Sequence, residues 1–150
     1  MSNGSERSAR EAVVIGGASG IGWATAQALA AEGCRVTIAD LNADSARDRA
    51  SELGSAHATV DVTDEDSVQL LFDGIGPLDI VVNCAGFSNV GLITDMPAED
   101  FRAVIDVCLN GAFIVAKHAG RHLREGGSLI QISSLNGRQP AAGMSAYCAA

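Results

Sequence analysis

Short apolar runs alternate along the chain with longer segments in which apolar and polar residues follow a helical period. The runs are about five residues long, and continuous apolar character is typical of parallel strands buried on both faces. We predict strands at 12–15, 35–39, 55–60, 79–83 and 128–133. Because a helical segment separates each run from the next, the pattern indicates crossover connections between parallel strands.

The helical segments carry start and stop signals. Thr63, with Asp66 three residues later, is close to a capping box at the start of one segment. Pro97 suits the first position of the longest segment, and the two glycines at 126–127 suit its end. The predicted helices are 21–33, 42–54, 63–75 and 96–127.

Repeated strand–helix units predict an α/β fold, a Rossmann-like doubly wound parallel sheet. We expect the strand order 3-2-1-4-5, with the topological switch between strands 1 and 4. Ligands bind such sheets at the carboxyl ends of the strands, so functional residues should gather at that edge. We expect one domain over 12–150 and a polar, disordered tail over 1–11.

Composition narrows the class of protein. With 47% apolar and 19% charged residues, the 150-residue chain has enough apolar material for a core. The net charge of −8 argues against a nucleic-acid surface or an anionic membrane as partner. We find neither a long uncharged apolar run nor an apolar leader, and we predict a cytoplasmic protein without a membrane segment.

Cysteine and histidine spacing gives no metal signal. The four cysteines lie far apart without a C-x-x-C pair, which predicts reduced thiols and no structural zinc. His118 and His122 have the spacing of two ligands on one helix face, but Lys117 and Arg121 stand beside them. We read this segment as the basic end of a helix rather than a metal site.

A glycine-rich turn, GGASGIG at 16–22, follows the first predicted strand and opens the first helix. Glycine lets backbone approach a pyrophosphate closely, and a helix N-terminus attracts the anion. A tight turn without a ligand is the alternative. The predicted phosphate contacts are Gly16, Ser19, Gly20, Ile21 and Gly22.

Asp40 ends the second predicted strand, 24 residues after Gly16. A carboxylate there accepts hydrogen bonds from both ribose hydroxyls of an adenosine and repels a 2′-phosphate. Ser19, Leu41 and Asn42 supply no cation for such a phosphate. We therefore predict NAD rather than NADP. A helix cap beside Asn42 is the alternative role for Asp40, and the two roles are compatible.

Together these residues resemble the short-chain dehydrogenase/reductase family over about 12–150. The matching segments are IGGASGIG (15–22), DVT (61–63), NCAG (83–86), ISSLNG (132–137) and YCAA (147–150). They are similar to the family's glycine turn, its adenine-contacting aspartate, its N-N-A-G segment, its catalytic serine and the start of Y-x-x-x-K. The resemblance implies that the cofactor also lies along Leu41, Asp61, Val62, Asn83, Ala85 and Gly86.

The resemblance assigns the catalytic groups. Ser134 and Tyr147 are 13 residues apart, the family's spacing of serine and tyrosine. Tyr147 would be the acid/base, and Ser134 would orient the substrate. The alternative for Ser134 is a hydroxyl at the strand end that caps the backbone, and this is the main interpretation of Ser133. Cys108 holds the family's asparagine position and would keep its backbone-carbonyl role. Asn110, about 200° further round the helix, does not replace it.

The resemblance also implies a lysine four residues after Tyr147, at position 151, just beyond Ala150. We therefore expect the chain to be the N-terminal portion of a longer protein and to stop within a helix that starts near Ser145. The implied function is an NAD(H)-dependent oxidoreductase for a secondary alcohol or ketone, with a polyol, a steroid and a 3-oxoacyl group as candidate substrates, in a homodimer or homotetramer. A loop at 92–97 is expected near the substrate. A non-catalytic dinucleotide-binding sensor or regulatory module is the alternative.

Overall fold

The computed structural model describes residues 9–150, and its centre is a five-stranded parallel sheet. The strand order is β3-β2-β1-β4-β5, as predicted. The strands are β1 (Glu11–Ile15), β2 (Arg35–Asp40), β3 (Ala56–Thr59), β4 (Leu78–Asn83) and β5 (Leu123–Gln131). All pairings in the sheet are parallel, so the carboxyl ends of the strands share one edge.

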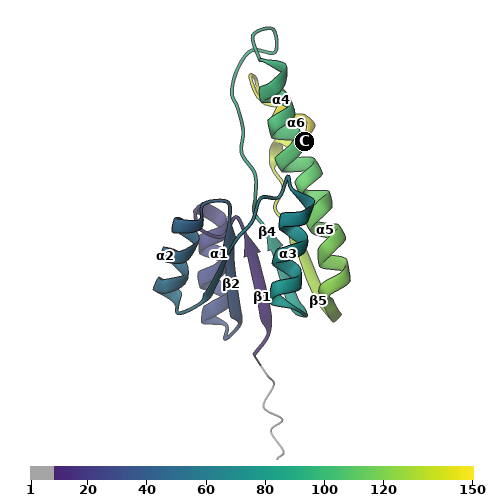
Figure 1. The fold of residues 1–150 in the computed structure, drawn as a ribbon. Coiled ribbons are helices and arrows are strands. Elements are labelled where there is room, and N and C mark those ends of the chain that lie inside the picture. Colours follow the sequence, from purple (N-terminus) through teal and green to yellow (C-terminus); the bar gives the residue numbers. More distant parts are fainter. Residues whose placement is uncertain (1–8) are drawn as a thin grey trace, which may run out of the picture.

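Helices cover both faces of this sheet, with α1 and α2 on one side and α3 and α5 on the other (Figure 1). The helices are α1 (Gly20–Ala31), α2 (Ala43–Leu53), α3 (Glu65–Ile75), α4 (Ala98–Ile105), α5 (Gly111–His122) and α6 (Ser145–Ala149). A π-helix, η1 (Asp106–Asn110), joins α4 to α5, and a 3₁₀ turn, η2 (Leu135–Gly137), follows β5. The Rossmann-like doubly wound α/β class is therefore confirmed.

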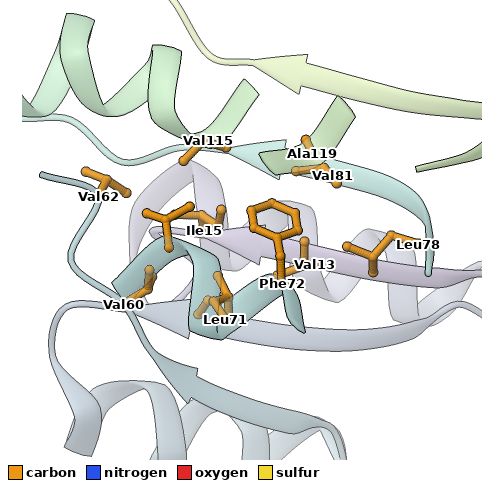
Figure 2. Close-up of a cluster of buried hydrophobic side chains, with 12 residues drawn as sticks. Val13, Ile15, Val60, Val62, Leu71, Phe72, Leu78, Val81, Val115 and Ala119 are labelled. Carbon is orange, nitrogen blue, oxygen red and sulfur yellow. The ribbon is translucent and has the colours of Figure 1, made fainter. Parts of the chain in front are cut away.

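The period-2 alternation of the strands divides the core in two. Val13 and Ile15 of β1 point to the α3–α5 face, where they pack around Phe72 (Figure 2). Ala12 and Val14, the alternate residues, pack on the α1–α2 face. The side chains of β1 are thus buried on both faces, which explains why its sequence is continuously apolar.

The N-terminal boundary differs from the prediction. Residues 1–8 of the predicted tail lie outside the described residues. Glu11, predicted to be the last tail residue, is the first residue of β1. Its N–H donates to Asp79 Oδ2 at 2.7 Å, and its carboxylate pairs with Arg35 of β2. Contacts with both neighbouring strands therefore extend β1 by one residue.

The cap of α3 is also corrected. Asp64, rather than Thr63, is the N-cap, and its Oδ1 accepts from Asp66 N–H at 3.0 Å. Thr63 turns back instead, and its N–H and hydroxyl both donate to Asp61 Oδ1. The hydroxyl of Thr63 is thus engaged with Asp61, and the next residue, Asp64, caps α3 instead.

The long helical segment is shorter than predicted. Pro97 is the N-cap of α4 rather than its first residue, and α5 ends at His122. The glycines at 126–127 lie inside β5, not at a helix end. A Cβ on Gly127 would stand 2.9 Å from the Leu123 side chain and 3.2 Å from Asp79 O. A side chain at this position would be crowded because β5 lies close to β4, next to the shift in register between the two strands.

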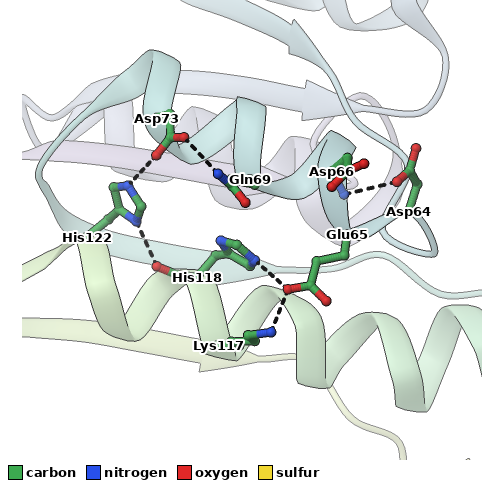
Figure 3. A network of polar contacts seen from close by, with 8 residues as sticks. All are labelled: Asp64, Glu65, Asp66, Gln69, Asp73, Lys117, His118 and His122. Atoms are coloured by element: carbon green, nitrogen blue, oxygen red, sulfur yellow. Dashed lines mark hydrogen bonds and ion pairs between the residues drawn. The ribbon is translucent and has the colours of Figure 1, made fainter.

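His118 and His122 take part in polar contacts between α3 and α5. His118 is 1% exposed, and its Nε2 lies 3.2 Å from Glu65 Oε1, which also accepts from Lys117 Nζ at 2.6 Å (Figure 3). His122 Nε2 lies 3.1 Å from Asp73 Oδ1. The pair thus joins two helices. Across residues 9–150, no group of three His, Cys, Asp or Glu side chains is placed to hold a metal ion.

One helical segment passes a test of length and composition for a membrane span. It runs over Ala98–His122, its most apolar 18-residue window has a mean hydropathy of 1.3, and 28% of that window is buried. A core helix of an α/β domain passes the same test, and α5 packs against α3 and β5. This is weak support for a span, and the absence of a membrane segment stays a prediction.

Candidate functional site

Two cavities open side by side at the carboxyl edge of the sheet. The larger has a volume of about 650 Å³ and the smaller about 410 Å³. They share the lining residues Gly16, Ser19, Cys84, Ala85, Gly86 and Phe87. Because the shared residues form a continuous wall, we treat the two cavities as one elongated site.

The glycine turn forms the middle of this site. Gly16 has φ +71°, and a Cβ on it would lie 2.9 Å from the backbone of Cys84 and Ala85. A Cβ on Gly22 would lie only 2.0 Å from Gly16 O. The turn is therefore folded so tightly against β4 and α1 that side chains at these two positions are excluded.

The other side of the turn is open. Gly20, which begins α1, has no atom within 4 Å of a built Cβ and lines the larger cavity beside Ile21. The N-cap of α1, Ser19, makes no side-chain capping bond, and the first turn of α1 holds no acidic residue. These unobstructed amides at a helix N-terminus fit an anionic phosphate.

Asp40 stands at the rim of the smaller cavity, at the end of β2. Its Oδ2 accepts from Ala18 N–H at 3.0 Å and its Oδ1 from Asn42 N–H at 3.1 Å. Asn42 itself caps α2 by accepting from Ser45 N–H at 2.9 Å, so Asp40 is not the helix cap. Each carboxylate oxygen keeps a further lone pair that can accept a hydrogen bond.

The smaller cavity gathers the residues predicted to contact the adenosine. Besides Asp40, its lining includes the predicted contacts Leu41, Asp61 and Val62. Asp61 Oδ1 is occupied by Thr63, so its other oxygen is the one left for a ligand. Among the described lining residues of both cavities there is no lysine or arginine.

Asn83 fixes the wall behind the site. It is 3% exposed, its Oδ1 accepts from Ala85 N–H at 3.1 Å, and its Nδ2 donates to Gln131 Oε1 at 2.8 Å. Gln131 Nε2 in turn donates to Ala112 O of α5 at 2.8 Å. Sequence reasoning missed Gln131, although a polar residue within the apolar run LIQI was a usable signal. Nearby, burial raises the pKa of the Cys84 thiol.

The larger cavity brings together the predicted catalytic residues Ser134, Tyr147 and Cys108. Ser134 follows β5, and its Oγ accepts from Asn136 N–H at 3.2 Å, so the predicted alternative role as a backbone cap is present. Tyr147 lies on α6. Ser133 also lines the cavity.

Cys108 lies in the π-helix η1, a type of distortion that is frequent at functional sites. Its Sγ donates to Phe87 O at 3.4 Å and so ties the long helix to the wall of the cavity. Asn110 instead donates to Asp106 Oδ1 at 2.8 Å. Asn110 is not among the lining residues of either cavity.

A doubly wound sheet with a glycine turn, a carboxylate at the end of β2 and a cavity at the switch between β1 and β4 defines a dinucleotide-binding domain. The family model described as short chain dehydrogenase matches residues 10–150. The chain belongs to the short-chain dehydrogenase family.

Curated relatives agree with this assignment. The cis-4-hydroxycyclohexanecarboxylate dehydrogenase of Sinomonas cyclohexanicum is 40% identical, with 94% of this chain and 61% of that protein covered. The sorbitol dehydrogenase of Cereibacter sphaeroides is 34% identical, with 93% and 58% covered. The probable oxidoreductase EphD of Mycobacterium bovis is 37% identical, with 90% and 25% covered. The chain thus spans less than two thirds of the length of these relatives.

Solved structures share the fold. A crystal structure of BdcA in complex with NADPH has a TM-score of 0.88 and 30% identity, covering 93% of this chain and 58% of that one. The crystal structure of gox2181 has a TM-score of 0.88 and 33% identity, covering 94% and 60%. The fold therefore supports binding of NAD or NADP.

Proposed function

We propose that the protein is an NAD(H)-dependent oxidoreductase that interconverts a secondary alcohol and a ketone. The observation that carries the proposal is that Ser134 and Tyr147 line the same cavity as the glycine turn. A protein that only binds a dinucleotide has no use for that arrangement. Relatives named as dehydrogenases do not favour the alternative of a non-catalytic sensor.

The side chains at the reaction end have complementary tasks. Ser134 Oγ accepts from Asn136 N–H, which leaves its O–H to donate to the substrate oxygen. Tyr147 takes the substrate hydroxyl proton during oxidation and returns it during reduction. When bound, the nicotinamide ring accepts or supplies the hydride.

The preference for NAD rests on Asp40. Its carboxylate would accept hydrogen bonds from the ribose hydroxyls and repel a 2′-phosphate. The described lining of the smaller cavity contains two carboxylates, Asp40 and Asp61, and no cation. The BdcA structure contains NADPH, so the fold by itself does not exclude NADP.

The substrate end of the larger cavity is lined by apolar and thiol side chains together with hydroxyl groups. Phe87, Leu109 and Cys148 contribute to it. The loop that follows Phe87 rises from the sheet beside α4 and α6 (Figure 1), and Gly91 N–H donates to Gly143 O at 2.9 Å. Ser88 is the last residue of this loop that lines the larger cavity, and none of 92–97 lines either cavity. A contact between 92–97 and an uncharged alcohol or ketone therefore stays a prediction.

Assembly as a homodimer or homotetramer through the long helix is part of the proposal. Leu109 and Phe113 are one helical turn apart and are 48% and 67% exposed. Exposed apolar side chains on one helix face are suited to a partner helix. Light scattering of the full-length protein, with Phe113→Ser as the variant, tests this. A wild-type monomer would contradict it.

The decisive experiment is turnover of the full-length protein on a panel of secondary alcohols and ketones with NAD and NADP. Tyr147→Phe should lower kcat by about 100- to 10,000-fold, because it removes the acid/base, while calorimetry finds an unchanged Kd for NAD. Ser134→Ala should lower kcat as well. Turnover with NADP alone would refute the role of Asp40, and wild-type protein that binds NAD without any turnover would favour the sensor.

A further inference from the structure

Ala18, in the middle of the glycine turn, is held through both of its backbone polar groups by charged side chains. Its N–H donates to Asp40 Oδ2 at 3.0 Å. Its carbonyl oxygen accepts from Arg49 Nε at 3.4 Å. A backbone bond from Gly17 N–H to Ala39 O, 3.1 Å long, also ties the turn to β2. Helix α2 therefore contacts the turn through the side chain of Arg49.

Arg49 is itself held in place from two other directions. Its guanidinium carbon lies 4.9 Å from the ring centroid of Trp23 on α1, within the range of a cation–π interaction. Its Nη1 donates to both carboxylate oxygens of Glu52, at 2.9 and 3.1 Å. A guanidinium stacked on an aromatic ring keeps its N–H groups in the plane for hydrogen bonds. Arg49 thus joins α2, α1 and the turn.

Trp23 offers Arg49 an aromatic surface that the core holds in place. It lies three residues after Gly20, in the first turns of α1, and packs against the core cluster on the α1–α2 face. The ring is therefore fixed by the core on one side while the guanidinium covers it on the other. A guanidinium held in this way keeps its hydrogen bond to the Ala18 carbonyl at a fixed place relative to the core.

Neither Arg49 nor Trp23 lines the larger or the smaller cavity. They are placed to affect a ligand through the turn, not by touching it. A turn whose amides are aligned beforehand loses less conformational freedom when a diphosphate binds, and this preorganisation strengthens binding. We propose that Arg49, stacked on Trp23, is a positioning residue that aligns the phosphate-binding turn for the dinucleotide. The inference rests on the proposed dinucleotide-binding function.

The test replaces Arg49 by methionine in the full-length protein, which keeps an unbranched apolar side chain and removes the guanidinium. We expect the Kd for NADH and the KM for NAD to rise about two- to fivefold, the effect of one such contact, with kcat unchanged. Arg49→Lys should lie between wild type and Arg49→Met, because lysine keeps a charge over the ring but lacks the planar fork.

The matched control is Arg47→Met. Arg47 lies on the same helix and forms ion pairs with Asp44 and Asp48, at 2.8 and 3.2 Å, without a contact to the turn. Both variants lose surface ion pairs on α2, so a general weakening of the helix affects them alike. Only the Arg49 variant should change KM and Kd.

Trp23 provides an independent readout, since it is the only tryptophan among the 150 residues. Arg49→Met should shift its fluorescence, whereas Arg47→Met should not. In a double-mutant cycle, Trp23→Leu and Arg49→Met should weaken NADH binding by less than the product of their separate effects. Additive effects, or an Arg49→Met protein with the Kd of Arg47→Met, would overturn the inference. Wild-type protein that does not bind NADH would refute the proposed function itself.

Discussion

Replacing Gly22 by alanine tests how closely the phosphate turn is fitted to α1. A Cβ at this position would lie 2.0 Å from Gly16 O and 2.8 Å from Gly16 C, whereas real Cβ contacts are essentially never below 3.0 Å. The obstacle is backbone and cannot rotate away. The turn and α1 must therefore separate by about 1 Å, which moves the amides that would face the diphosphate.

A displacement of about 1 Å in groups that position a substrate costs about 100-fold. For Gly22→Ala we expect kcat/KM for NAD to fall by about that factor, through a higher KM together with a lower kcat, and the Kd for NADH measured by calorimetry to rise. The thermal melting curve should be recorded alongside, because a folded variant with weak binding is the expected outcome.

Gly74→Ala is the matched control for this substitution. Gly74 lies within α3, and no atom stands within 4 Å of a Cβ built there. The same change should leave NADH binding unaltered and stabilise the fold by about 0.4–1 kcal/mol, because alanine restricts the unfolded chain more than glycine does. Wild-type affinity in a folded Gly22→Ala protein would refute the argument from the turn.

Three further changes probe the core, the helix contacts and the reaction end. Phe72→Ala empties a fully buried position and should lower the free energy of unfolding by about 3–5 kcal/mol in urea titrations. Leu70 is exposed, so Leu70→Ala should change this free energy little. Equal effects of the two substitutions would contradict the packing in Figure 2. Hydrogen bonds from a lysine and then a histidine of α5 lower the pKa of the Glu65 carboxyl, so its stabilisation is complete above the unfolded pKa of about 4.3 and is lost as the pH falls through the folded value. The stability advantage of wild type over Glu65→Gln should therefore shrink on acidification below that pH, and parallel curves would disprove the link. Cys108→Asn exchanges the thiol that donates to Phe87 O for an amide donor. Because one hydrogen bond replaces another, urea titrations should show a gain in stability smaller than the about 1 kcal/mol of a whole hydrogen bond, and a less stable variant would count against this contact.

The central strands could be located from the sequence because β1, β2 and β4 are largely buried and therefore consist mostly of apolar residues. The end of the long helix could not. Gly126 and Gly127 carry a local helix-stop signal, but the close approach of β5 to β4 places them in a strand. Tertiary packing here overrides a rule that looks only at neighbouring residues.

The predicted site residues are those with local motifs, and the structure gathers them around the two cavities. The roles of Gln131, Arg49 and Trp23 were not predicted, because their contacts join residues that are far apart in the sequence. Gln131 reaches 48 residues back to Asn83, and Arg49 reaches 31 back to Ala18. These hydrogen-bond partners depend on how the helices pack on the sheet, and the spacing of residues along the chain does not predict them.

The two ends of the elongated site depend on different parts of the fold. The proposed adenosine end is built on β2, through Asp40 and its contact with Ala18. The proposed reaction end is built on residues in or next to β5, η1 and α6, through Ser134, Cys108 and Tyr147. Substitutions at the first end should therefore appear mainly in the KM and Kd of the dinucleotide, and those at the second mainly in kcat. The glycine turn belongs to both cavities, so a change there that moves the turn bodily should be the one that disturbs binding and turnover together.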